Sequence, residues 1–255
     1  MLLEEVAIAR EHGVGLHLHM AVGPEDNADT IARYGLTATQ ALDRAGFFEG
    51  RVHAAHCLDL SDADIAIFPE HPSASIAYCA SAGLRSGREG ICPAVKLRQS
   101  GVVVAIGTDN VAANNSYDMV SEMRVAGLVA SHRERRAQPI SSRDLVRMAT
   151  IEGARALGLD HEIGSLEAGK AADIVAIDLR GAGYSETPDP ETLLVYSGSG
   201  RDVRHVWVAG EQLVRDRQLV RRPFDDIRRD YSAAYAAFWR RVADDKKTTI
   251  KREVA

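Results

Sequence analysis

Cysteine residues, long apolar runs and an excess of positive charge are what this sequence has least of, and each shortage excludes a class of protein. The three cysteines, Cys57, Cys79 and Cys92, show no Cys-x-x-Cys spacing, so we expect no disulfide framework and a reducing compartment. No apolar run reaches the length of a membrane span. The first residues carry Glu4 and Glu5 instead of the basic flank of a signal peptide. We therefore expect a cytoplasmic location and no membrane partner.

The charge balance also argues against a polyanionic partner. The formal net charge is -5 at pH 7, which gives no electrostatic reason to expect binding to nucleic acid. What is present is ordinary for a globular protein: 45% hydrophobic and 26% charged residues. A chain of 255 residues can bury a real core, as one domain or as two unequal ones.

The most informative stretch is the apolar run 102–106, which leads into Gly107, Thr108 and Asp109. An apolar run without alternation predicts a strand that is buried on both faces, as in a parallel sheet. A carboxylate just beyond such a strand lies where α/β barrels place their catalytic groups. The alternative is that Asp109 only caps the following helix, because aspartate is favoured at helix N-termini.

Three further strands precede this one. They are predicted at 14–22, 51–57 and 73–79, with helices between them, and this alternation has the spacing of βαβ units with parallel pairing. Segment 80–90 is expected to be a loop, and 116–135 and 141–157 are expected to be longer helices.

After Leu159 the pattern changes to short strands at 173–179, 203–208 and 212–214, with a glycine hairpin at 206–211. A final amphipathic helix is predicted at 224–244, and its aromatic stripe is most simply core or docking surface. We therefore expect three regions: an α/β segment at 1–159, a β-rich portion at 160–222, and a C-terminal helix and tail at 223–255.

Three of the predicted strand ends carry groups that suit metal binding or proton transfer: His17 with His19, His56, and Asp109. Imidazole and carboxylate groups bind zinc or iron, and parallel strands bring their carboxyl ends together. His17 and His19 share one face, so only one of them need be a ligand. His53 and His56 are expected on opposite faces, which makes His53 structural. A single histidine on an apolar strand is usually a core residue, so it is the convergence of three ends that favours function.

These residues lie in a series of motifs that resembles the amidohydrolase superfamily. The resemblance is in particular to the branch of cytosine and guanine deaminases, S-adenosylhomocysteine deaminases and triazine chlorohydrolases. It runs from about residue 14 to about residue 220. The motifs that carry it are His17-Leu18-His19-Met20-Ala21, Ala54-Ala55-His56-Cys57, Gly107-Thr108-Asp109, Asn114-Asn115, Glu122-Met123-Arg124 and Gly164-Ser165-Leu166-Glu167-Ala168-Gly169-Lys170.

The resemblance implies the C-terminal half of a metal-dependent (β/α)₈ barrel in region 1–159, and part of a flanking β-sandwich in region 160–222. It implies one divalent ion, zinc or alternatively iron, which activates water to displace ammonia, an amine or chloride from a heterocyclic substrate. By motif position, His19 resembles a metal ligand, and Asp109 resembles a metal ligand that is also the general base. His56 resembles the histidine that polarises the substrate or orients the attacking hydroxide.

The chain departs from the family pattern in its ligands and its strand count. The His-x-His pair of the first barrel strand has no counterpart, and only four strand–helix units precede Leu159, whereas a closed barrel has eight. We therefore expect a truncated chain that is inactive alone, or a half completed by a second copy in a homodimer or by a complementing N-terminal half.

It also departs from the pattern in two side chains. Val22 occupies the position of the usual proton-donating glutamate, with Glu25 or Asp26 as candidate substitutes, and Tyr78 occupies the place of a family histidine, where we expect an altered substrate contact. These departures keep a second hypothesis open, a non-catalytic protein with the amidohydrolase fold that serves in binding or assembly.

Overall fold

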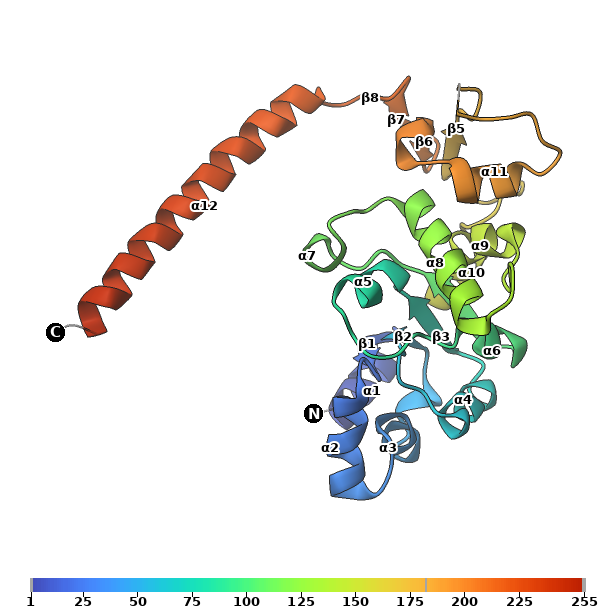
Figure 1. Cartoon of the computed structure of the whole chain (residues 1–255), viewed down its shortest axis with the longest axis vertical. Coiled ribbons are helices and arrows are strands. Elements are labelled where there is room, and N and C mark those ends of the chain that lie inside the picture. The colour runs from blue at the N-terminus through green and yellow to red at the C-terminus, as the bar shows by residue number, and fades with distance from the viewer. Residues whose placement is uncertain (1, 182, 254–255) are drawn as a thin grey trace. The chain divides into compact units, whose positions relative to one another are not determined.

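The computed structural model describes residues 2–181 and 183–253, and these form two compact units (Figure 1). The first unit comprises Met1–Ala172 and Asp178–Asp202, and the second comprises Asp173–Ile177 and Val203–Ala255. None of the helices in these described residues is both long enough and apolar enough to cross a membrane.

The first unit is built on a four-stranded sheet in the order β1-β2-β3-β4, and every pair of neighbours is parallel. This result confirms the parallel βαβ arrangement that the sequence predicted. The strands are β1 (Leu16–Met20), β2 (Val52–His56), β3 (Ala74–Tyr78) and β4 (Val103–Ile106).

Helices connect these strands and follow the last one. α1 (Leu2–Glu11) precedes β1, and three helices pack against β4: α8 (Met119–Glu134), α9 (Ser142–Met148) and α10 (Ile151–Leu157). The remaining helices are α2 (Pro24–Tyr34), α3 (Ala38–Arg44), α4 (Asp62–Ile67), α5 (Ala80–Arg85), α6 (Ala94–Gln99), α7 (Val111–Asn114) and α11 (Pro190–Ser197), with short 3₁₀ turns η1 (Phe47–Glu49), η2 (Phe68–Glu70) and η3 (Gly200–Asp202).

Two predicted elements were wrong. Segment 80–90 is not a loop throughout, because α5 occupies its first half with Ala80 and Ala82 buried. No side chain caps this helix, so burial and not a local sequence signal accounts for it. The single helix expected at 141–157 is two helices, α9 and α10, because Thr150 has φ -129° and ψ -99°, outside the helical region.

The register of the sheet sorts its side chains into rows that cross all four strands. One row, Leu18–Ala54–Ile76–Val104, lies on one face, and Ala54, Ile76 and Val104 are completely buried. Because side chains alternate between faces, the rows on either side of it lie on the opposite face. These are His17–His53–Ser75–Val103 and His19–Ala55–Ala77–Ala105. Beyond His19 the second of them consists of alanines, so its neighbours within that row are small.

The second unit contains an antiparallel four-stranded sheet in the order β5-β6-β7-β8 and a long helix, α12 (Phe224–Glu253). Its strands are β5 (Ile174–Ile177), β6 (Val203–Val208), β7 (Glu211–Arg215) and β8 (Gln218–Leu219). Ala209 and Gly210 both have positive φ, as a two-residue hairpin of type I′ requires, which confirms the predicted turn. The predicted portion 160–222 holds all four strands, but also α11, which belongs to the first unit.

Candidate active site

Three of the predicted site residues meet at the carboxyl ends of the parallel strands. His19 lies near the end of β1, His56 ends β2, and Asp109 follows β4. The rings of His19 and His56 are stacked, with centroids 5.1 Å apart and planes inclined by 14°. His56 Nε2 lies 3.9 Å from Asp109 Oδ2. The structure therefore brings together the imidazole and carboxylate groups that the sequence marked separately.

The backbone at this edge of the sheet adopts a conformation that side chains rarely occupy. Ala21, His56, Cys57 and Asp109 have φ of 46°, 72°, 51° and 58°. Such residues persist only where their surroundings hold them, and they concentrate at functional sites. Here the Cys57 amide donates to Met20 O at 3.0 Å, which ties the end of β2 to the end of β1.

This backbone conformation corrects the prediction that His53 and His56 lie on opposite faces. His53 packs on His17, with ring centroids 5.0 Å apart, and His56 packs on His19, so both rings lie against histidines from one face of β1. The positive φ of His56 ends the regular alternation of the strand, so its side chain does not follow the pattern. The ring of His53 is fixed by a 2.8 Å hydrogen bond between its Nδ1 and Ser75 Oγ.

Asp109 is not the cap of the following helix. The N-cap of α7 is Asn110, whose side chain accepts a hydrogen bond from the Ala113 amide. Asp109 Oδ1 instead accepts from Asn110 N at 2.6 Å and from Asn110 Nδ2 at 2.9 Å. Its second oxygen, Oδ2, is the one that faces His56. The capping alternative is therefore wrong, and the carboxylate is oriented towards His56.

His56 is almost completely buried and is held mainly in its neutral form. Burial lowers its pKa, and the nearby Asp109 carboxylate opposes that shift without cancelling it. The buried Nδ1 of His56 has no hydrogen-bond partner among the described residues. The gap of 3.9 Å between His56 and Asp109 is too long for a direct hydrogen bond. Among the described residues neither the buried Nδ1 nor the Nε2 that faces Asp109 makes a hydrogen bond, and unpaired buried polar groups of this kind are expected where a further group binds.

Tyr78 does not join this group. Its side chain is 1% exposed and buried among the residues that line a small cavity, with Leu58, Cys92 and Val129. Burial raises the pKa of its phenol, and the hydroxyl has no partner among the described residues. The expected substrate contact by Tyr78 finds no support in this placement, and we leave it out of the proposed site.

The two candidate replacements for a glutamate at Val22 are already engaged. The Val22 amide donates to Asp26 Oδ2 at 2.8 Å. Arg88 donates to Glu25 Oε1 at 2.7 Å. Both acids line an open hollow beside His19, together with Arg88. Each acid therefore lies near the site with one of its two oxygens engaged, Asp26 Oδ2 in a hydrogen bond and Glu25 Oε1 in an ion pair.

The structure also reveals residues that sequence reasoning did not place at the site. Arg88 lies in segment 80–90, for which the sequence predicts only a loop. Asn114 and Glu122 were quoted only as motif letters, yet Asn114 donates both to Glu122 Oε2 and to the carbonyl oxygen of Thr108, next to Asp109. Their signal was the motif series itself, which carries no information about side-chain contacts.

A divalent ion fits the donor chemistry of this site. His19 offers an imidazole and Asp109 a carboxylate, both ligands that zinc accepts. His56 lies beside both, with its ring stacked on His19 and its Nε2 facing Asp109. Within residues 2–181 and 183–253, however, no three histidine, cysteine, aspartate or glutamate side chains are close enough to enclose an ion. The residues present therefore suit a part of a coordination sphere.

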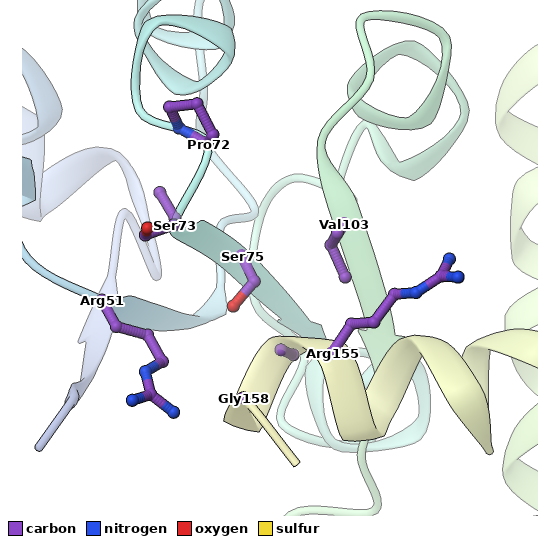
Figure 2. Close-up of a pocket in the computed structure, with 9 residues that line it drawn as sticks. Arg51, Pro72, Ser73, Ser75, Val103, Arg155 and Gly158 are labelled. Carbon is purple, nitrogen blue, oxygen red and sulfur yellow. The ribbon is translucent and has the colours of Figure 1, made fainter. Parts of the chain in front are cut away.

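A second hollow lies at the opposite ends of the strands. Ser75 and Val103, near the start of β3 and β4, line it with Arg51 and with Arg155 and Gly158 of the α10 region (Figure 2). The Arg51 guanidinium donates to the carbonyl oxygen of Leu157. In parallel α/β barrels this end of the strands contributes to stability while chemistry occurs at the carboxyl ends. We therefore place the candidate site at the His56 end.

Comparisons with known proteins find relatives of most of this chain. The model of the amidohydrolase family matches residues 1–213. A 5-methylthioadenosine/S-adenosylhomocysteine deaminase from Teredinibacter turnerae is 37% identical over 246 residues, which cover 96% of this chain and 54% of the relative. An S-triazine hydrolase from Gordonia rubripertincta is 34% identical over 222 residues, which cover 85% of this chain and 44% of the relative.

Solved structures are similar to this chain over most of its length. A zinc-bound adenosine deaminase from Xanthomonas campestris superposes with a TM-score of 0.87 at 33% identity, covering 94% of this chain and 53% of that one. A zinc complex of an atrazine chlorohydrolase from Arthrobacter aurescens gives a TM-score of 0.83 at 28% identity, covering 91% of this chain and 51% of that one. The chain thus spans about half the length of the relatives it matches.

Proposed function

This chain belongs to the amidohydrolase family, and from that premise we propose that it carries part of the active site of a zinc-dependent hydrolase. In the reaction, hydroxyl would add to an electron-poor ring carbon of a heterocycle, and an amine, ammonia or chloride would leave that carbon. The observation that carries the proposal is the meeting of His19, His56 and Asp109 from three different strand ends, with the His19 and His56 rings stacked and His56 Nε2 3.9 Å from Asp109 Oδ2. We further propose a cytoplasmic location, which the three buried free cysteines support.

His19, His56 and Asp109 would each have a different role at this site. His19 and Asp109 would hold the ion, which when bound supplies a water whose pKa is lowered to about 7. Asp109 Oδ2 is the oxygen that Asn110 leaves available, so it is suited to accept the proton of the attacking water. His56, kept neutral by burial, would orient the nucleophile or polarise the ring of the substrate.

The acids near the site bear on the leaving group. Chloride leaves as a stable anion, whereas ammonia or an amine needs a proton. One oxygen of Glu25 is paired with Arg88 and one oxygen of Asp26 accepts from the Val22 amide, which holds each side chain in an acceptor role. This engagement favours halide displacement if the described residues supply the acid. Deamination would then need an acid from another part of the complete barrel.

The metal site can be tested on the 255-residue chain itself. We expect the chain to bind zinc, and Asp109→Ala to weaken binding by about 10-fold or more, because a ligand is lost. Competition with a chromophoric chelator measures the affinity. Asp62→Ala, whose side chain is 85% exposed on α4, is the matched control and should bind like the parent. Equal zinc affinity in the Asp109 and Asp62 variants would contradict the proposal.

A second candidate function is a non-catalytic role in binding or assembly. The engaged acids beside Val22 and the incomplete donor set favour it. A partner, either a second copy or a chain with the other half of the barrel, would then cover the sheet without turnover. Zinc binding that depends on Asp109 counts against this alternative. An absence of zinc binding, with the chain folded, would support it.

A further inference from the structure

Glu122 is a buried carboxylate that the reaction proposed above does not use. It lies in the first turn of α8 and is 1% exposed. Among the described residues it makes no ion pair. The partial positive charge of the α8 N-terminus compensates part of its charge. A carboxylate in such a place is costly to bury, and its hydrogen bonds indicate what holds it there.

Both oxygens of Glu122 accept hydrogen bonds from the short helices that follow β3 and β4. Oε1 accepts from the Ser81 amide at 2.9 Å, in the first turn of α5, directly after β3. Oε2 accepts from Asn114 Nδ2 at 3.2 Å, at the end of α7, after β4. The carboxylate therefore links the connections that follow two neighbouring strands, at the edge where the site lies.

The link continues to Asp109 through the backbone. Asn114 Nδ2 also donates to Thr108 O at 2.9 Å, so both hydrogens of this amide are used. Thr108 immediately precedes Asp109, which is held at φ 58°. Fixing the carbonyl of Thr108 fixes the peptide plane that enters this strained residue. The direction of Asp109 Oδ2 towards His56 depends on that plane.

We propose that Glu122, acting through Asn114 and Thr108, is a positioning residue for Asp109. The proposal rests on the assignment of Asp109 to the active site made above. It requires a carboxylate in particular, because both partners of Glu122 are N–H donors. Glutamine has only one acceptor oxygen, and its NH₂ would then face the NH₂ of Asn114 or the Ser81 amide. A purely structural role would tie α5 to α8 without affecting Asp109.

The test uses Glu122→Gln in the 255-residue chain, with two measurements. Backbone NMR signals of Thr108, Asp109 and Asn110 report the conformation, and chelator competition reports zinc affinity. We expect these signals to shift and zinc affinity to fall by about 10-fold, the usual effect of losing a group that orients a ligand. Glu134→Gln, the same change at the far end of α8, is the control and should alter neither.

Asn114→Ala gives a second, milder variant, because Asn114 is only half-buried and the bond between Ser81 and Glu122 is retained. It should shift the same signals. Unmoved signals at residues 108–110 in both variants, with the parent binding zinc, would overturn the positioning role and leave the proposed function intact. Shifted signals in a chain whose parent binds no zinc would support the positioning role and overturn the metal site instead.

Discussion

At the scale of single residues, backbone conformation determines which side chains enter the site. The alternation of a regular strand places His17 and His19 correctly, since both contact histidines of β2. It fails at His56, where φ of 72° turns the side chain towards His19. A positive φ at a bulky residue has no sequence signal comparable with a glycine, because tertiary contacts impose it.

His53 should make the stability of the chain depend on pH. Burial, reinforced by the neighbouring His17, lowers the pKa of His53 from 6.5 to about 4. The unfolded chain therefore takes up a proton at this residue before the folded chain does. We expect stability to be fully present above pH 6.5 and to fall as the pH drops from 6.5 towards 4.

Urea unfolding midpoints at several pH values measure this effect. His53→Gln should have a flatter profile than the parent between pH 6.5 and 4, whatever its stability at neutral pH. His12→Gln, at an exposed position after α1, should retain the parent's slope. Parallel profiles for the His53 variant and the parent would show that His53 is not the source of the pH dependence.

At the scale of elements, one aspartate holds the start of the long helix α8 and the segment that follows α11. Asp118 Oδ1 accepts from the amides of Val120 and Ser121, and Oδ2 accepts from the Ser121 hydroxyl and the Gly200 amide. Burial by itself would raise the pKa of Asp118. The hydrogen bonds, led by that from the Ser121 side chain, outweigh burial and lower this pKa.

Removing this cap should destabilise the chain. We expect Asp118→Ala to lower the free energy of unfolding by about 1–2 kcal/mol at neutral pH, the usual cost of a lost N-cap. A lowered aspartate pKa gives stability that is lost on acidification through the folded-state pKa, so the difference should shrink in acid. Urea denaturation measures this difference in the free energy of unfolding. Asp29→Ala, exposed on α2, should change stability little, and an equal loss there would contradict the assignment.

The elements also show how far the sequence alone could lead. Apolar runs and turn residues predicted the four parallel strands, because burial on both faces leaves a continuous apolar signature. They missed α5, which no side chain caps, and the break at Thr150. For the site, residue type and order predicted His19, His56 and Asp109. The contacts of Glu122 and Arg88 arise from loops folding together and have no local pattern.

At the scale of the whole molecule, the parallel sheet is open on both sides. Within the described residues, β1 and β4 each pair with a single strand, and His17 and His19 of β1 are exposed. Unpaired strand edges can pair with another strand, and a closed barrel has no such edges. The relatives are about twice as long as this chain, and the chain corresponds to their C-terminal half. We propose that a second set of strands pairs with these open edges.

A hybrid protein tests this pairing. We expect the 255-residue chain alone to show no turnover, and a fusion behind the N-terminal half of the Teredinibacter turnerae deaminase to gain it, because the added strands would supply further metal ligands. S-adenosylhomocysteine and a chlorinated triazine are the substrates, with released ammonia and chloride as readouts. The fusion with Asp109→Ala is the control and should lose activity by at least about 100-fold, since it lacks a ligand and base. Turnover by the chain alone would refute the need for a second half, and a folded, zinc-loaded fusion without turnover would favour the binding role.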